Sequence, residues 1–138
     1  MVNGERSWTY RELDEQSNRL ARVLIRSGAR SETFVAVALT RGIESVTAVW
    51  AVAKTGAAFV PIDPNYPADR IEYMVADSNV HAGLTVGSAR TALPDSVDWL
   101  VIDDPAFVLD GDASAVVPAV GADHAAYVIY TPGSTGLP

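Results

Sequence analysis

Apolar side chains along the first part of the chain follow first a helical and then a continuous spacing. Between residues 10 and 27 they recur at helical spacing, with charged side chains between them. Thr9 and Glu12 form the pattern of a capping box at the start of this segment, and Gly28 suits a left-handed cap at its end. Residues 34–39 are then apolar throughout, which is typical of a strand covered on both faces. The pattern predicts a helix over 10–27 and a buried strand after it.

The same alternation continues through the middle of the chain. Residues 43–55 have a helical pattern that Gly56 ends, and residues 57–62 form the next strand-like apolar run. A proline-rich turn follows, and Pro67 suits the first turn of a helix that reaches about Ser78. Three more apolar runs with strand character lie at residues 82–86, 97–102 and 126–130.

The segments between these later runs are less regular. Residues 88–93 show a weak helical turn, whereas residues 103–123 are acidic and poorly periodic and are interpreted as a surface excursion. At least the first two gaps between strands hold a helix, which is the spacing of βαβ crossovers. The sequence therefore predicts an α/β fold with a partial, mainly parallel sheet and helices on its faces. Residues 1–138 show no internal repeat and no interdomain linker.

Composition and charge exclude several classes of function. With 49% hydrophobic and 20% charged residues, the 138-residue chain has the composition of a globular domain. Its net charge of −7 argues against a nucleic-acid partner or an anionic membrane surface. The chain has no cysteine, which excludes disulfides, thiolate catalysis and cysteine-ligated zinc. The first residues do not resemble a signal peptide, and the apolar stretch 46–53 is too short to span a bilayer, so a cytoplasmic location is expected.

Small and hydroxyl-bearing residues near the end of the chain are the candidate for chemistry. Gly133, Ser134, Thr135 and Gly136 follow the predicted strand 126–130. A loop of such residues can wrap its backbone N–H groups around a phosphate, and the carboxyl end of a parallel strand is where α/β sheets place ligands. The same four residues also suit a plain surface turn, which they favour when taken alone. They match neither the Walker P-loop nor the dinucleotide fingerprint.

Three motifs in order give the chain a resemblance to a known family. Residues 8–13 read WTYREL, residues 53–64 read AKTGAAFVPIDP, and residues 127–138 read YVIYTPGSTGLP. The chain resembles the N-terminal part of an adenylation domain from nonribosomal peptide synthetases, in the superfamily of adenylate-forming, AMP-binding enzymes. The last motif is similar to the phosphate-loop motif of that family, and the second favours peptide synthetases over acyl-CoA ligases.

The resemblance implies a function for the parent domain. Such a domain joins an amino acid to AMP with ATP and Mg²⁺, releases pyrophosphate, and passes the acyl group to phosphopantetheine on a carrier domain. The residues that would map onto the loop holding the ATP phosphates are Thr131, Gly133, Ser134, Thr135 and Gly136. The implied partners are the rest of the adenylation domain and the carrier domain.

Two departures from the family pattern change the expectation for this chain. Pro132 stands where the family has serine, which removes a hydroxyl and a backbone N–H. The sequence ends at Pro138, before the Lys-Gly that completes the motif. We therefore expect residues 1–138 to be a truncated N-terminal part that is catalytically inactive alone. Apolar strands that lack part of their cover also predict a homo-oligomer.

Two other classes of function remain open at this point. The chain could be an interaction module that pairs with a complementary fragment or another domain. It could also be a small phosphate- or nucleotide-binding α/β protein with no role in adenylation.

Other polar and aromatic residues have structural interpretations. Asp63 is expected to cap a turn, and Arg70 to anchor its helix by an ion pair. His81 and His124 do not have the spacing of metal ligands. The adjacent acids at 103 and 104 could bind a hard cation, but such pairs are usually solvated. Core packing is expected for the three tryptophans, Trp8, Trp50 and Trp99.

Overall fold

The computed structural model describes residues 2–118 and 120–132. In chain order, its elements are β1 (Val2–Asn3), β2 (Arg6–Ser7), α1 (Tyr10–Arg26), β3 (Phe34–Ala38), α2 (Ile43–Thr55), β4 (Ala58–Pro61), α3 (Ala68–Ser78), β5 (Ala82–Thr85), α4 (Gly87–Arg90) and β6 (Asp98–Val101).

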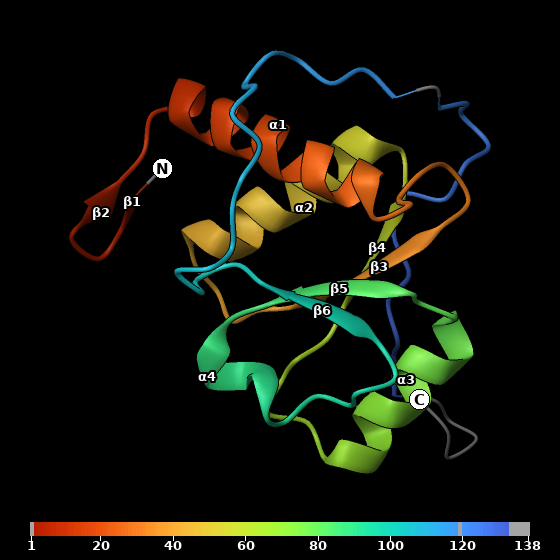
Figure 1. Ribbon diagram of the computed structural model, residues 1–138. Helices are drawn as coiled ribbons and strands as arrows, with labels where there is room; N and C mark the ends of the chain where they lie inside the picture. Colours follow the sequence, from red (N-terminus) through yellow and green to blue (C-terminus); the bar gives the residue numbers. More distant parts are fainter. Residues whose placement is uncertain (1, 119, 133–138) are drawn as a thin grey trace.

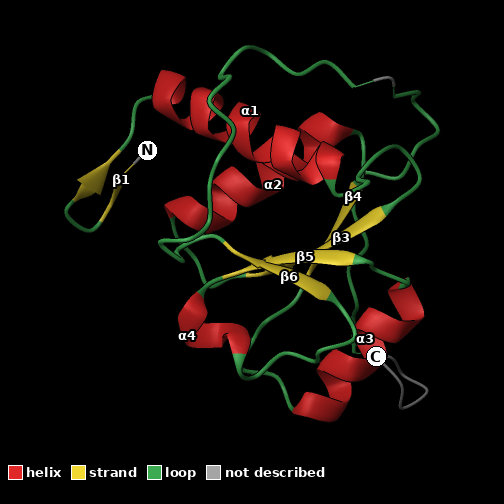
Figure 2. Cartoon of the chain, in the orientation of Figure 1, coloured by secondary structure: helices red, strands yellow, loops and turns green. Residues whose placement is uncertain are grey.

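A four-stranded parallel sheet in the order β4-β3-β5-β6 forms the centre of the molecule. Helices α1 and α2 cover one face of this sheet, and α3 and α4 lie on the other (Figures 1 and 2). Strands β1 and β2 form a separate antiparallel hairpin before α1. The predicted α/β fold with a mainly parallel sheet and helices on its faces is confirmed.

Local sequence signals explain where the first two helices begin and end. The Thr9 hydroxyl accepts a hydrogen bond from the Glu12 N–H at 3.1 Å, and the Glu12 carboxylate accepts one from the Thr9 N–H at 2.7 Å. This is the predicted capping box, and it satisfies two backbone donors that the helix leaves free. Helix α2 ends at Gly56, whose φ of 85° lies in the left-handed region that favours glycine.

Two apolar clusters form the core, one on each face of the sheet. Val35 and Val37 of β3 face α1 and α2, whereas Ala36 and Ala38 face the side of α3. The alternation along one strand explains why its sequence is apolar at every position, because both faces are buried. The helix residues that complete the first cluster are Leu20, Ala21, Leu24, Ala48, Ala51 and Val52. Those of α3 in the second are Ile71, Met74 and Val75.

The segment after β6 is the surface excursion that its aperiodic sequence predicts. It passes over α1 without regular secondary structure in its described part (Figure 1). The Arg22 guanidinium holds it there by donating to the Ser114 hydroxyl at 2.6 Å and pairing with the Asp112 carboxylate at 3.2 Å. Asn18 adds a hydrogen bond to the Ala113 carbonyl at 2.9 Å.

Three expectations are corrected by the structure. The predicted strand 126–130 is wrong, because only Tyr127 forms a bridge, to Phe59 of β4, and the residues after it turn toward α3. Trp50 is not in the core but 41% exposed, on the outer face of α2, whereas Trp99 is buried as predicted.

The third correction concerns Arg70. No ion pair of Arg70 is found within the described part of the chain, and its guanidinium lies 4.3 Å from the centre of the Tyr66 ring. The hairpin of β1 and β2 is an additional element, for which the sequence pattern gave no indication. None of the helices in the described ranges is long and apolar enough to cross a membrane.

Candidate functional site

A cavity of about 420 Å³ opens at the carboxyl ends of β3 and β4. This volume lies in the range of small-molecule sites, and this edge of a parallel sheet is where α/β folds bind ligands. Its apolar walls include Val37, Leu39, Pro61, Ile62 and Met74. The polar residues at the cavity come from the loops that follow the two strands and from the start of α2.

The turn after β4 forms one wall of this cavity. The Asp63 carboxylate accepts hydrogen bonds from the Asn65 backbone N–H at 2.9 Å and from the Asn65 side-chain amide at 3.0 Å. Asp63 therefore caps a turn, as predicted. Tyr66, which follows it, holds the guanidinium of Arg70 over its ring.

The start of α2 forms the opposite wall. The Ser45 hydroxyl accepts from the Gly42 N–H at 3.1 Å and donates to the Gly42 carbonyl at 2.8 Å, which closes the first turn of the helix. Thr40 and Arg41 precede this turn and also line the cavity. Arg41 is thus a positively charged residue in the lining of the cavity.

The segment 126–130 leads past the outer edge of β4 to the predicted phosphate loop. The Phe59 N–H donates to the Ala126 carbonyl at 3.2 Å, and the Val128 N–H donates to the Phe59 carbonyl at 3.0 Å. Ile129 and Tyr130 then reach the cavity and form part of its lining. The chain therefore reaches Thr131 at the carboxyl edge of the sheet.

Tyr130 is fixed to helix α3 immediately before the loop. Its hydroxyl donates to the Asp77 carboxylate at 2.5 Å, and its ring meets the Tyr73 ring edge-on, with centres 6.2 Å apart. Burial, followed by the adjacent Asp77 carboxylate, raises the pKa of Tyr130 to about 12. The hydroxyl is therefore a hydrogen-bond donor at any physiological pH.

Of the residues predicted to hold phosphate, only Thr131 lies in the described part of the chain. It directly follows Tyr130 and is exposed, and so is Pro132. Gly133, Ser134, Thr135 and Gly136 lie outside the described residues. The prediction of a phosphate cradle over 131–136 stays a prediction.

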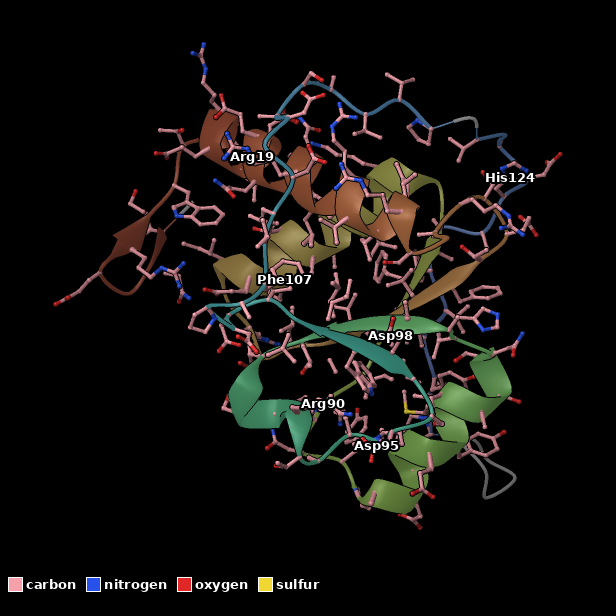
Figure 3. The ribbon with its side chains drawn as sticks, viewed as in Figure 1. Arg19, Arg90, Asp95, Asp98, Phe107 and His124 are labelled. Atoms are coloured by element: carbon pink, nitrogen blue, oxygen red, sulfur yellow. The ribbon has the colours of Figure 1, made fainter. Side chains whose placement is uncertain are left out.

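Other candidate residues have local structural roles. His124 lies on the loop before segment 126–130 (Figure 3), where its Nδ1 accepts a hydrogen bond from the Gly121 N–H at 3.0 Å. The Asp103 carboxylate accepts from the Gly87 N–H at 2.7 Å, and the Asp104 carboxylate accepts from the Ala106 N–H at 2.8 Å. No group of three or more metal-ligating side chains is found among the described residues.

A second cavity, of about 350 Å³, lies between the β1–β2 hairpin, α1, α2 and the segment after β6. Trp8 and Phe107 contribute aromatic walls to it, and Phe107 is seen beside α2 in Figure 3. The ion pair between Arg6 and Glu44 stands at the same cavity. Among the described residues that line this cavity, only Trp8 belongs to one of the three motifs.

Sequence reasoning did not identify the contact between Asp77 and Tyr130. The two residues are 53 positions apart, and neither has a local signal that indicates the other. Tyr130 lies inside the third motif, whereas Asp77 lies on helix α3, which follows the second motif in the chain. The structure brings the third motif into contact with this helix.

Comparison with known proteins gives a consistent result along the whole chain. The family model described as AMP-binding enzyme matches residues 1–138. The dimodular nonribosomal peptide synthase of Bacillus subtilis is 45% identical over 94% of this chain, which covers 6% of that protein. Bacitracin synthase 3 of Bacillus licheniformis is 41% identical over 100% of this chain, which covers 2% of that protein.

Solved structures agree with the sequence relatives. The nonribosomal peptide synthetase FmoA3 in its alpha-methyl-L-serine-AMP bound form superposes with a TM-score of 0.85 at 28% identity, over 96% of this chain and 15% of that one. The N-terminal subdomain of NpsA from Klebsiella oxytoca gives a TM-score of 0.81 at 28% identity, over 98% of this chain and 35% of that one. The chain thus spans a small part of each relative.

Proposed function

The chain belongs to the family of AMP-binding enzymes and corresponds to the N-terminal part of a nonribosomal peptide synthetase adenylation domain, and from this premise we propose that it is part of a unit that activates an amino acid with ATP. The product would be an aminoacyl-adenylate, with pyrophosphate as the leaving group. The acyl group would then pass to the phosphopantetheine thiol of a carrier domain.

The observation that supports this proposal most directly is the route of segment 126–130. It runs along β4 and delivers Thr131 to the carboxyl edge of the sheet, beside a cavity of about 420 Å³. A phosphate loop placed there meets the edge at which parallel sheets bind nucleotides. The AMPPNP-bound form of FmoA3, which superposes on this chain with a TM-score of 0.85, supports ATP as the nucleotide.

In this proposal the chain contributes binding and orientation. The Thr131 and Ser134 hydroxyls and the backbone N–H groups at 133–136 would donate to the β- and γ-phosphates of ATP. Catalysis of acyl-adenylate formation depends on such donors and on in-line positioning. Bound Mg²⁺ would offset the negative charge of the phosphates. Among the described residues, no group of three or more side chains would hold the metal by itself.

The proposal assigns the complete reaction to a longer polypeptide. Residues 1–138 cover 6% of the Bacillus subtilis synthase and 15% of the FmoA3 chain. Most groups that contact the amino acid and the ribose in such enzymes therefore belong to other parts of the domain. We expect the 138-residue chain alone to be catalytically inactive.

A chimera tests the proposed activity. Residues 1–138 would replace the matching segment of the Bacillus subtilis dimodular synthase, and exchange of labelled pyrophosphate into ATP would be measured with its amino acids. We expect amino-acid-dependent exchange in the chimera and none with the 138-residue chain. Thr135→Ala in the chimera should lower exchange about a hundredfold, because it removes a donor to the phosphates. The matched control is Thr91→Ala, at an exposed threonine remote from the cavity. A folded chimera without exchange, or with equal exchange in both variants, would contradict the proposal.

A binding measurement on the chain itself tests the loop. Titration with pyrophosphate, followed by NMR, should shift the amide resonances of residues 131–136. Pro132→Ser should strengthen this binding modestly, because serine restores a backbone N–H and a hydroxyl. Shifts confined to residues far from the loop would count against the assignment.

A further inference from the structure

The charge of Asp77 is poorly placed for the helix that carries it. Asp77 lies in the last turn of α3, and this turn contains no basic residue. A negative charge at a helix C-terminus is unfavourable, because the backbone carbonyls there already carry partial negative charge. Helix stability therefore does not account for a carboxylate at this position.

The described contact of the Asp77 side chain is with Tyr130. The 2.5 Å distance between the Tyr130 hydroxyl and the Asp77 carboxylate is that of a charge-assisted hydrogen bond. The edge-on contact with Tyr73 holds the Tyr130 ring against the same helix. Two side chains of α3, one turn apart, thus form a seat for Tyr130.

Tyr130 makes the last side-chain contacts along the described part of the chain, immediately before Thr131. Upstream, Phe59 of β4 holds segment 126–130 by two backbone hydrogen bonds, to Ala126 and Val128. Ile129, between these bonds and Tyr130, is 58% exposed and gives little attachment. The contacts of Tyr130 with Asp77 and Tyr73 therefore fix the position of the backbone immediately before Thr131.

We propose that Asp77 is a positioning residue for the phosphate loop: by accepting the hydrogen bond of Tyr130, it fixes the backbone at the residue that precedes Thr131. The inference rests on the proposed phosphate-binding role of residues 131–136. The proposed effect is preorganisation. A loop whose first residue is already fixed loses less conformational freedom when it binds a phosphate. Loss of the Tyr130–Asp77 hydrogen bond raises this entropic cost of binding without removing a residue that would contact the phosphate.

The test separates affinity from stability in the 138-residue chain, with pyrophosphate as the probe. Asp77→Ala removes the acceptor and should weaken pyrophosphate binding about fivefold, the effect of one lost hydrogen bond. The same variant should leave the urea midpoint nearly unchanged, because the unfavourable charge that it removes from the end of α3 offsets the hydrogen bond that it loses. A residue that only stabilised the fold would instead lower the midpoint.

Two further variants make the result specific. Asp77→Asn keeps an oxygen acceptor and should restore part of the affinity. Glu72→Ala removes a carboxylate from the exposed side of the same helix, and so controls for the general gain in anion binding when a negative charge is lost. Its affinity should equal or exceed that of the unchanged chain. Tyr130→Phe should lower the affinity for pyrophosphate as much as Asp77→Ala does, because it removes the donor of the same hydrogen bond.

The outcomes distinguish this inference from the proposed function. If the unchanged chain binds pyrophosphate at 131–136 and Asp77→Ala binds it equally well, the inference is overturned and the proposed function stands. If the unchanged chain gives no shifts at 131–136, the inference is overturned together with the assignment of the loop, and the exchange activity of the chimera decides the proposed function. A fall in affinity that is accompanied by an equal fall in the urea midpoint also overturns the inference, since it would show a structural role alone.

Discussion

The ring of Trp99 on β6 lies directly against Gly83 on β5, its cross-strand neighbour. A Cβ atom added at Gly83 would lie 2.4 Å from Cζ3 of the indole and 2.5 Å from Cε3. The ring itself is held, because it is buried in the cluster facing α3 and its N–H donates to the Pro94 carbonyl at 2.7 Å. The absence of a side chain at 83 is therefore what admits the tryptophan.

We predict that Gly83→Ala destabilises the chain by about 1–3 kcal/mol, the cost of overpacking a fixed core. The indole cannot move aside without losing its hydrogen bond or its packing. Urea unfolding followed by Trp fluorescence would measure the change. Gly111→Ala is the matched control, because a Cβ there meets no atom within 4 Å. Equal midpoints for the two variants would contradict the prediction.

Lys54 of α2 joins this helix to α1. Its ammonium donates to the Asp14 carboxylate at 2.6 Å, to the Asn18 side-chain oxygen at 2.7 Å and to the Ser17 hydroxyl at 2.8 Å. Ser17 and Asn18 are buried, so their oxygen atoms depend on this donor. The hydrogen bond from Lys54 lowers the pKa of Asp14 below its ordinary value of 3.8.

We predict that Lys54→Met lowers the free energy of unfolding by about 2 kcal/mol at pH 7, since it leaves a buried acceptor unpaired. Arg11→Met, which removes the same charge from the exposed face of α1, should have little effect.

The loss caused by Lys54→Met should depend on pH. Because the pKa of Asp14 is lowered in the folded chain, its stabilisation is present above pH 3.8 and disappears as the pH falls through the folded value. The difference between the two proteins should therefore shrink below about pH 4. A difference that stays constant from pH 7 to about pH 2 would show that Asp14 takes no part.

Most of the helices and strands could be predicted because their signals are local. The capping box at Thr9 and the left-handed Gly56 are fixed by neighbouring residues, and continuous apolar runs mark strands that two layers of helices bury. The run at 126–130 has the same apolar composition but forms a single bridge. An apolar run alone does not distinguish a strand from a segment that leans on a sheet edge.

Trp50 and the contact between Tyr130 and Asp77 show where local sequence signals fail to predict the structure. Helix α2 carries apolar side chains on more than one face, so its pattern does not tell which face the sheet covers, and Trp50 is left beside the ammonium of Lys54, 5.8 Å from the ring centre. The phosphate-loop residues were predicted from a resemblance of motifs, whereas the contact of Tyr130 with Asp77 could be found only in the folded chain. Contacts of this kind depend on how α3 packs, which no spacing in the sequence encodes.

The capping box of α1 gives a prediction about helix ends. Thr9→Ala removes the hydroxyl that accepts from the Glu12 N–H, and should cost about 1 kcal/mol in the free energy of unfolding. Thr91→Ala, at an exposed threonine, should cost much less. Both are measured by urea unfolding monitored by circular dichroism. A Thr9 variant as stable as the Thr91 variant would show that the cap adds nothing to the stability of the chain.

The outer side of segment 126–130 gives a prediction about association. Tyr127 and Ile129 are 57% and 58% exposed, and within the described residues no strand pairs with this side of the segment. Unpaired backbone beside apolar side chains favours pairing with a second copy. The net charge of −7 opposes this weakly, because salt screens charges over about 8 Å at physiological ionic strength.

We therefore expect the 138-residue chain to form a homo-oligomer at high micromolar concentration in sedimentation velocity experiments. Ile129→Lys should shift it toward monomer, because a buried ammonium in the interface would lose its hydration without a partner. Val108→Lys makes the same change at a residue that is 79% exposed on the excursion after β6, away from this edge, and should leave association unchanged. If the unchanged chain sediments as a compact monomer, or if both lysine variants dissociate it equally, then the edge formed by Tyr127 and Ile129 is not the contact.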